Sequence, residues 1–170
     1  MIALIHVAHG WACFAAGEAG IAACTLPQPT AQQALRQVDP GLALPARGDS
    51  LLPRVGKELG RYFAGERVAL DFPLDLSGVR PFARRVLLAV ARIPYGETRG
   101  YGWIAREVGR PRAARAVGQV MARNPLAPIV PCHRVIGGDG SLTGFGGGLE
   151  YKRFLLEMEG AGAAQAKPWR

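Results

Sequence analysis

Residues 101–136, YGWIAREVGRPRAARAVGQVMARNPLAPIVPCHRVI, decide how the second half of this chain folds. They predict two short helices, Tyr101–Val108 and Pro111–Arg123, because glycine ends helices and proline suits the first helical turn. A glycine separates the two helices, and Asn124-Pro125 stops the second. Two short helices joined by a glycine-containing turn form the helix-turn-helix pattern.

An extended segment broken by prolines, Leu126–Ile136, follows the two helices and contains Cys132. The other elements expected in this half are a helix at Pro81–Ile93, a turn-rich loop at Ile93–Gly102, a glycine-rich loop at Gly137–Gly148 and an amphipathic helix at Leu149–Glu159.

The first half predicts a small module of strands and helices. Residues 2–26 have the pattern of strands, with Gly17–Gly20 as a hairpin loop that places Cys13 roughly opposite Cys24. The later elements expected are a short helix near Thr30–Gln37, a helix at Leu51–Ala64 and an edge strand at Val68–Leu76, where Pro73 would be tolerated.

The charge is unevenly distributed about a boundary placed at Ser77-Gly78. Residues 1–76 contain six Lys or Arg against seven Asp or Glu, whereas residues 77–170 contain fifteen against six. A cationic module beside a neutral one favours a polyanionic partner, first of all nucleic acid. Arginine used as generic surface charge is the alternative. We therefore expect domains at 1–76 and 77–160, with 161–170 as a flexible tail.

Composition places the chain among ordinary globular proteins, with 49% hydrophobic and 20% charged residues. No apolar run is long enough for a membrane span, and we expect neither a signal peptide nor a membrane partner. Three cysteines, an odd number, favour free thiols. We expect a cytoplasmic protein.

The strongest chemical signal is Pro131-Cys132-His133-Arg134-Val135. A thiol is a nucleophile only as thiolate, and a nearby imidazole commonly takes its proton. Adjacent residues of an extended segment point to opposite sides, however, so His133 should reach the sulfur only through a water or a sharp bend. The alternative is that Cys132 is a small buried apolar residue beside Ile129-Val130.

Two further features accompany this motif. The second helix carries Ala114 and Gly118, small residues that allow close approach to DNA or to a neighbouring helix, with Arg115 among alanines. The loop Gly144-Phe145-Gly146-Gly147-Gly148 lets backbone N–H groups approach a ligand, although a mobile hairpin tip would have the same composition.

Taken together, the residues from about Phe63 to Gly160 resemble the O6-alkylguanine-DNA alkyltransferases, also called methylated-DNA-protein-cysteine methyltransferases. The motifs that match in order and spacing are Phe63-Ala64-Gly65, Phe72-Pro73-Leu74-Asp75, Ile93-Pro94-Tyr95-Gly96-Glu97-Thr98, Ala114-Arg115-Ala116-Val117-Gly118, Asn124-Pro125, Pro131-Cys132-His133-Arg134-Val135, Gly147-Gly148-Leu149 and Glu159-Gly160. Residues 1–62 match only in layout.

The resemblance implies an α+β fold. A small N-terminal α/β domain, ribonuclease-H-like, would precede a mainly helical C-terminal domain with a winged-helix-like helix-turn-helix. It also implies a single-turnover DNA repair reaction in which the alkyl group of O6-alkylguanine moves irreversibly to the protein after the nucleotide is flipped out of the duplex. O4-alkylthymine is a further candidate substrate. No cofactor is implied, and the expected partner is alkylated double-stranded DNA, bound through the minor groove by a monomer that is nucleoid-associated when bound.

The resemblance also assigns catalytic roles to single residues. Cys132 is the expected alkyl acceptor, His133 the base acting through a water, and Glu159 the group that orients His133. Tyr101 would contact the guanine and help to protonate N3, and Asn124 would link the recognition helix to the active-site segment.

The binding roles fall on the recognition helix and on the walls of the base pocket. Arg115 is the expected finger that fills the gap left by the flipped base. The other positions implied in DNA binding are Arg112, Ala114 and Gly118, and those implied in the base pocket are Val135, Phe145, Gly146 and Gly147.

The chain departs from the family at two positions. Many relatives have Tyr at Phe145 and Ser or Arg at Gly146, so the preferred alkyl group is left open by the sequence. Inactive alkyltransferase-like relatives replace the acceptor cysteine, whereas this chain keeps Cys132.

Other interpretations compete with the repair reaction. Some relatives hold zinc, and the candidate ligands here are His6, His9, Cys13 and Cys24. Their spacing matches no compact zinc motif, and we expect no metal. A lesion-binding protein without chemistry, or a cysteine hydrolase using Cys132 and His133, are the alternative functions. An intact Cys132, His133 and Glu159 disfavour the first, and the lack of a second histidine in this half disfavours the second.

Overall fold

The computed structural model describes residues 1–42 and 51–161 and divides the chain into two compact units. Unit 1 comprises residues 1–78 together with Pro125–Ile129, and unit 2 comprises the rest of the described chain. The tail expected at 161–170 lies, except for Ala161, outside the described residues. Within the described part, no helix is both long and apolar enough to cross a membrane. The architecture is mixed α/β.

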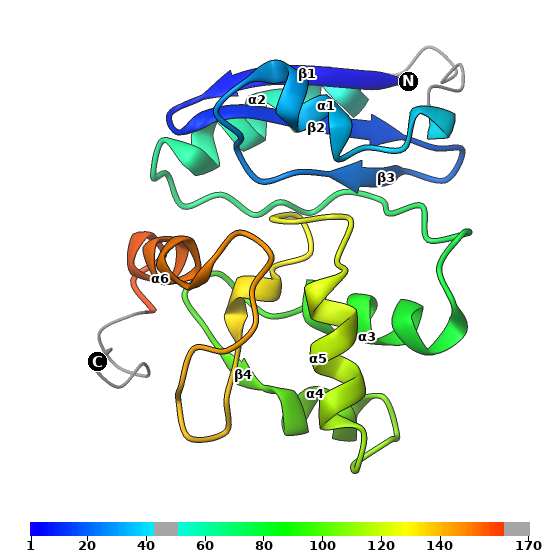
Figure 1. The fold of residues 1–170 in the computed structure, drawn as a ribbon, viewed down its shortest axis with the longest axis vertical. Helices are drawn as coiled ribbons and strands as arrows, with labels where there is room; N and C mark the ends of the chain where they lie inside the picture. Colours follow the sequence, from blue (N-terminus) through cyan, green and yellow to red (C-terminus); the bar gives the residue numbers. More distant parts are fainter. Residues whose placement is uncertain (43–50, 162–170) are drawn as a thin grey trace. The chain divides into compact units, whose positions relative to one another are not determined.

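Unit 1 is built on an antiparallel sheet in the order β1-β2-β3, formed by β1 (Ile2–Val7), β2 (Gly10–Ala16) and β3 (Ile21–Cys24) (Figure 1). The hairpin between β2 and β3 is as predicted, but its register is not. A bulge next to Ala15 and Ala16 shifts the pairing, so Cys24 lies opposite Phe14 and not Cys13. Because side chains alternate along a strand, Cys13 and Cys24 face opposite sides of the sheet.

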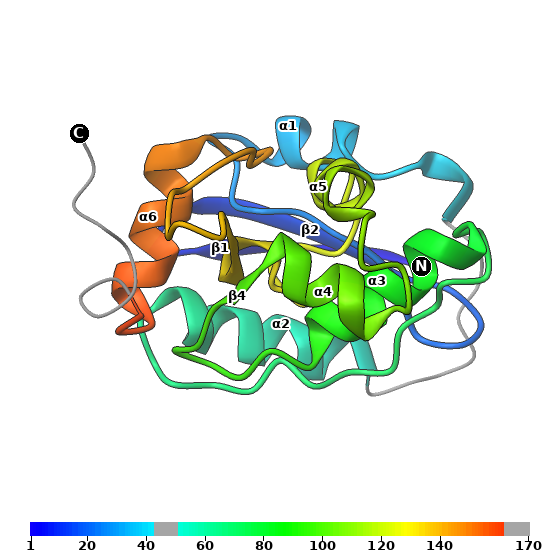
Figure 2. The same ribbon diagram turned by 90° about the horizontal axis from the view of Figure 1, so that it is seen from below.

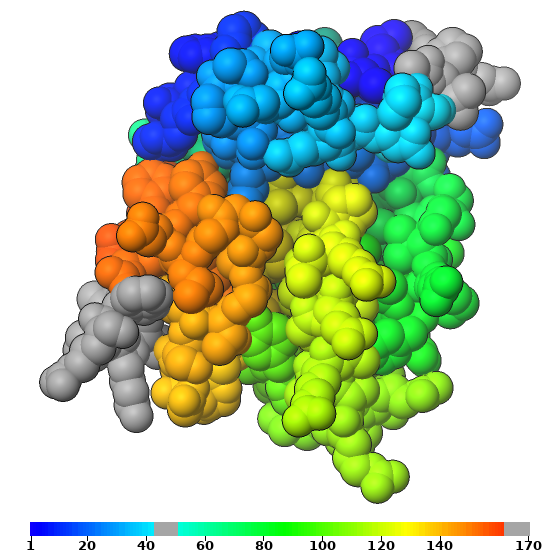
Figure 3. Space-filling model, in the orientation of Figure 1, coloured from blue at the N-terminus to red at the C-terminus, as the bar shows by residue number. Residues whose placement is uncertain are grey.

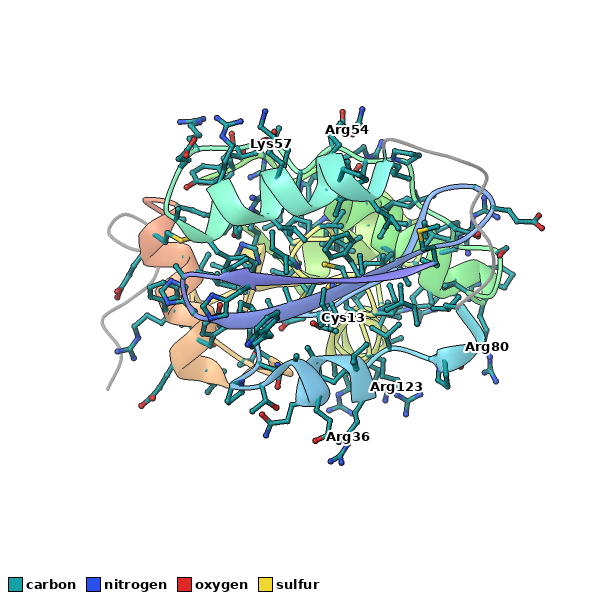
Figure 4. The ribbon with its side chains drawn as sticks, turned by 90° about the horizontal axis from the view of Figure 1, so that it is seen from above. Cys13, Arg36, Arg54, Lys57, Arg80 and Arg123 are labelled. Atoms are coloured by element: carbon teal, nitrogen blue, oxygen red, sulfur yellow. The ribbon has the colours of Figure 1, made fainter. Side chains whose placement is uncertain are left out.

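Helices cover both faces of this sheet, α1 (Ala31–Arg36) on one and α2 (Leu51–Phe63) on the other (Figures 2 and 4). Thr30 caps α1 in a reciprocal capping box with Gln33. A 3-10 turn, η1 (Pro40–Leu42), follows α1. Cys13 packs in the core on the α1 side, whereas Arg54 and Lys57 point outward from α2 (Figure 4).

The predicted edge strand at Val68–Leu76 is wrong as a regular strand. The segment is extended, and its pairing consists of one parallel bridge between Ile21 and Leu74. Pro73 lacks an N–H and joins through its carbonyl, which accepts the N–H of Ile21 at 2.8 Å. The alternation of apolar residues still indicated which side chains are buried, because Val68 and Phe72 lie in the core.

Unit 2 contains three helices that pack on one another, α3 (Pro81–Ala91), α4 (Tyr101–Glu107) and α5 (Ala114–Ala122). Pro81 occupies the first turn of α3, and Gly109, at a φ of 73°, ends the turn after α4, as the sequence predicts. The predicted start of α5 at Pro111 is wrong by three residues, because residues 110–113 form a turn closed by the Ala113 N–H on the Arg110 carbonyl.

The segment expected to be extended through Ile136 instead bends at Cys132. It forms a 3-10 turn, η2 (Cys132–Arg134), and then β5 (Val135–Ile136), which pairs in parallel with β4 (Arg99–Gly100). The last helix, α6 (Leu149–Met158), packs against η2. This bend places the side chains of three consecutive residues in the interior of unit 2.

Candidate active site

Cys132 is the first residue of η2, and its side chain is buried. Its N–H donates to the Val130 carbonyl at 2.8 Å, which turns the chain at the cysteine. Burial raises the pKa of the Cys132 thiol, while a hydrogen bond with the Asn124 side chain and the positive charge of Lys152 lower it. The net shift is upward, so the group rests as a thiol at neutral pH.

His133 is fully buried and contacts Glu159, the residue that follows α6 and caps its C-terminal end. The distance from His133 Nε2 to Glu159 Oε1 is 2.8 Å. Although burial alone would raise the pKa of Glu159, hydrogen bonds to His133 and Arg134 hold it well below its ordinary value. An ionised carboxylate only accepts hydrogen bonds, so Nε2 carries the ring proton and Nδ1 has the lone pair.

The charge state of His133 follows from the same surroundings. Burial lowers its pKa, Glu159 acts against this, and the positive charges of Arg134 and Lys152 lower it further. His133 is therefore neutral at pH 7 and able to accept a proton at Nδ1.

Arg134 completes a buried triad that the sequence did not suggest. Its Nε and Nη2 atoms donate to the two oxygens of Glu159 at 2.8 and 2.9 Å. Its Nη1 atom donates to the carbonyl of Ile93 at 2.6 Å. The fork geometry of guanidinium allows this two-point contact with a carboxylate.

Lys152 is a second functional candidate that sequence reasoning missed. It is fully buried on α6, and its Nζ atom donates to the carbonyls of Val135 at 2.6 Å and Thr143 at 3.0 Å. The ammonium also lies about 6 Å from the rings of Tyr101 and Phe145. Burial lowers the pKa of Lys152 to about 8, against the opposite effect of Cys132.

Tyr101, Asn124 and Phe145 are brought to the same region by different elements. The Tyr101 hydroxyl donates to the Thr143 carbonyl at 3.0 Å, and burial raises its pKa. Asn124 follows α5, and its side-chain amide donates to the Val130 carbonyl at 2.9 Å. Asn124 bonds the Cys132 side chain and Tyr101 interacts with it electrostatically, whereas Glu159 contacts His133.

Comparisons with known proteins identify the family. Residues 81–161 match the model of the 6-O-methylguanine DNA methyltransferase DNA-binding domain. The chain resembles the crystal structure of O6-methylguanine methyltransferase from Mycobacterium tuberculosis with a TM-score of 0.73 and 38% identity, over 99% of this chain and 97% of that one. The chain belongs to the O6-methylguanine-DNA methyltransferase family.

Other members of the methyltransferase family are similar over different lengths. The methylated-DNA–protein-cysteine methyltransferase of Mycolicibacterium paratuberculosis is 57% identical over 103 residues, which are 61% of this chain and 62% of that protein. The match therefore spans about three fifths of such curated relatives. A crystal structure of Mycobacterium tuberculosis OGT in complex with DNA has a TM-score of 0.69 at 38% identity, over 98% of this chain and 95% of that one.

Not every position singled out by the methyltransferase resemblance lies at the sulfur. Arg112 and Arg115 are exposed, and Ala114 is half-buried at the start of α5. Gly118 faces the Tyr101 ring, since a Cβ atom placed on it would lie 3.8 Å from that ring. A Cβ atom at that distance would make an ordinary van der Waals contact, so the Tyr101 ring alone leaves room for an alanine at 118.

The remaining positions singled out in unit 2 lie near β5 and in the glycine-rich loop. Val135 is buried in β5, and Gly146 and Gly147 are exposed in the loop. In unit 1, Cys13 and Cys24 are buried on opposite sheet faces. Within residues 1–42 and 51–161, His, Cys, Asp and Glu form no group of three or more that could hold a metal ion.

The missed residues left a recognisable signal. Lys152, Leu155, Leu156 and Glu159 recur at helical spacing and are all buried. A charged residue on the apolar stripe of a helix is rare without a specific partner. Reading Lys152 as part of that stripe would have placed it near the site.

Proposed function

We propose that this protein repairs DNA by transferring the alkyl group of O6-alkylguanine to the sulfur of Cys132, once per molecule. The observation that carries the proposal is the Cys132-His133 pair, backed by the ionised Glu159, in a chain of the methyltransferase family. The thioether product is stable, and the described residues supply no second nucleophile positioned to remove the alkyl group, so turnover ends there.

The proton balance is simple. The sulfur attacks the alkyl carbon, a C–S bond forms and the C–O6 bond breaks. The thiol proton passes to Nδ1 of His133, through a water, because Cys132 rests as a thiol. Guanine would be a poor leaving group as an anion, so Tyr101 donates a proton toward N3 as the bond breaks. The His133 imidazolium then loses its extra proton to solvent and the Tyr101 phenolate takes one up, so that overall the thiol proton and the alkyl group exchange places.

Tyr101 must change partner for this step. Its hydroxyl donates to the Thr143 carbonyl in the free protein, at 3.0 Å. Lys152 donates to the same carbonyl, so that acceptor stays satisfied when Tyr101 turns to the base. The charge of Lys152 also favours the thiolate form of Cys132.

The DNA-binding part of the proposal rests on α4 and α5, which we infer to be a helix-turn-helix in a winged-helix-like domain, with unit 1 as a ribonuclease-H-like domain. In Figure 3, α5 is at the surface, and the surface is recessed between it and the glycine-rich loop. Arg115 is exposed on this helix and Arg112 is exposed in the turn before it, with Ala114 half-buried at the start of the helix and Gly118 on the side facing Tyr101. We propose minor-groove binding by a monomer, with Arg115 filling the gap left by the flipped base.

The base itself would enter between Tyr101 and the loop that carries Phe145. Val135, Phe145, Gly146 and Gly147 would line that space, with the Phe145 ring stacked on the purine. The exposed glycines leave backbone N–H groups to contact the base.

Mass spectrometry tests the reaction directly. Incubation with one equivalent of O6-methylguanine duplex should add about 14 Da, one CH₂ group, to the peptide containing Cys132. Cys132→Ser should abolish the increase, and Cys24→Ser, at a buried thiol of unit 1, should retain it. Transfer by Cys132→Ser, or binding of the lesion without any mass change, would refute the proposal.

A second experiment tests the arginine finger. Arg115→Ala should slow repair of duplex much more than reaction with free O6-benzylguanine, because the free base needs no flipping. Arg106→Ala, at an exposed arginine of α4, is the matched control. Equal losses on both substrates would remove the finger role.

A further inference from the structure

The carboxylate of Glu159 is shared between two partners. Oε1 accepts from His133 and from Arg134 Nη2, and Oε2 accepts from Arg134 Nε. The side chains of Glu159 and His133 are at most 1% exposed, and that of Arg134 is 11% exposed. Water therefore screens these charges very little.

The guanidinium of Arg134 is held from other directions as well. Nη1 donates to the Ile93 carbonyl at 2.6 Å, and the group lies 5.6 Å from the centre of the Tyr95 ring. A lysine could supply the charge here but not the two parallel contacts to Glu159.

The charges that face His133 decide whether it can act as a base. They are Glu159, which follows α6, Lys152 within α6 and Arg134 in η2. The thiol of Cys132, the preceding residue in the chain, is neutral. Two cations and one anion act on the ring electrostatically, so an imidazolium would be a third buried positive charge. Without Arg134, one cation and one anion would remain, and the pair formed by His133 and Glu159 would take up a proton more readily.

The additional proton would prevent His133 from acting as a base, whether it bound to His133 or to Glu159. On His133 it would occupy the Nδ1 lone pair. On Glu159 it would let the carboxylic acid donate to Nε2, which would move the ring proton to Nδ1. Either outcome leaves no acceptor directed to the sulfur.

We propose that Arg134 is a positioning residue for the reaction at Cys132, which by holding both oxygens of Glu159 keeps His133 uncharged and in the tautomer that accepts a proton at Nδ1. This inference rests on the proposed alkyl transfer for its consequence, but the state of His133 is testable without it.

The experiment follows two quantities over pH 4 to 9, a range of about 2.5 units either side of the ordinary histidine value. One is the single-turnover rate with free O6-benzylguanine, which removes DNA binding from the measurement. The other is the protonation of His133 by NMR. The proteins compared are wild type, Arg134→Lys, Arg134→Gln and the control Arg99→Gln, which breaks a partly exposed ion pair with Glu97.

In wild type and Arg99→Gln, His133 should stay neutral well below its ordinary pKa of about 6.5. In Arg134→Gln the acid limb of the rate profile should move up by about one pH unit or more, with the rate recovering at high pH. In Arg134→Lys, which keeps the charge but not the two-point contact with Glu159, the acid limb should move up by less. A merely structural role would lower the rate equally at all pH values. That result would overturn the inference. A wild-type His133 that is charged near pH 6.5 would also overturn it, and this measurement does not depend on whether a variant folds. No transfer by wild type would refute the proposed function alone, because the NMR titration still tests Arg134.

Discussion

The three cysteines of this protein are all buried, yet their surroundings differ between the two units. Cys13 is packed in unit 1 among alanine and valine side chains, and its N–H is bonded to Thr25. Burial raises the pKa of Cys24 far above its ordinary value, with little to oppose it besides a backbone hydrogen bond. Cys132 in unit 2 is equally buried but faces the Asn124 amide and the Lys152 ammonium.

Burial alone therefore does not distinguish a structural thiol from a reactive one. Each sulfur is removed from water, and each has its pKa raised by that removal. The difference lies in polar groups contributed by neighbouring elements, because in unit 2 the Asn124 side chain and the Lys152 charge lower the pKa of the thiol against the effect of burial.

The largest effect should come from removing the carboxylate that organises the Cys132 surroundings. Glu159→Gln leaves the Arg134 charge buried without its counterion, which should lower the free energy of unfolding by about 3–5 kcal/mol. Urea unfolding monitored by circular dichroism measures this loss. Glu66→Gln, which removes an exposed partner of Arg61, should have a much smaller effect, because water screens that pair. Similar losses in both variants would show that the buried triad contributes no more to the free energy of unfolding than an exposed ion pair does.

The prediction for Glu159→Gln depends on contacts between residues distant in the chain, which local sequence patterns could not predict. Pro81 and Gly109 correctly marked the ends of α3 and α4, because capping depends on the residues at the helix end. The bend at Cys132 was considered only as an alternative to an extended segment. Its neighbour Arg134 bonds Glu159 and Ile93, which are 25 and 41 residues away in the chain, and strand alternation contains no trace of such contacts.

The candidate site could be predicted only in part, because the sequence reveals local motifs but not contacts between distant residues. The Cys132-His133 motif is contiguous and was visible, whereas Arg134 within it was read without a role. The register of Cys13 and Cys24 depended on one bulge that loop length does not reveal. Pro111 suits either a turn or a helix start, so the first residue of α5 was ambiguous.

The next effect concerns the buried cation beside the sulfur. The pKa of Lys152 is lowered to about 8, so the folded state loses this proton before the unfolded state does as the pH rises. Between pH 8 and the unfolded value of about 10.4 the unfolded chain binds more protons, and folding should gain about 3 kcal/mol from this residue. Below pH 8 the full cost of burying the charge is present.

Lys152→Met tests this linkage by removing the titrating group. The stability of the parent minus that of the variant, from urea unfolding, should rise between pH 8 and about 10.4. Both proteins should carry Cys132→Ala, so that the thiol does not titrate in the same range. A difference in stability that stays constant across that pH range would show that folding does not lower the pKa of Lys152.

A smaller kinetic effect should separate the three thiols by their reactivity toward iodoacetamide. Cys132 should be modified faster than Cys13 or Cys24, because the Asn124 side chain and the Lys152 charge favour its thiolate. Peptide mass spectrometry after short exposures gives the three rates. Reaction of Cys24 at a rate equal to that of Cys132 would remove the contrast between the units.

The smallest effect on stability and on alkyl transfer should come from replacing Cys24, which among the described residues has no amide or ammonium side chain beside it like those near Cys132. Cys24→Ala deletes one buried atom opposite Phe14 and should lower the free energy of unfolding by about 1 kcal/mol, with alkyl transfer unchanged. Cys132→Ala should abolish transfer whatever its effect on stability. Thermal unfolding and the mass assay on the same two samples measure both quantities. If Cys24→Ala slowed transfer while remaining folded, the chemistry at Cys132 would depend on the core of unit 1, and its immediate polar neighbours would no longer be a sufficient explanation of its reactivity.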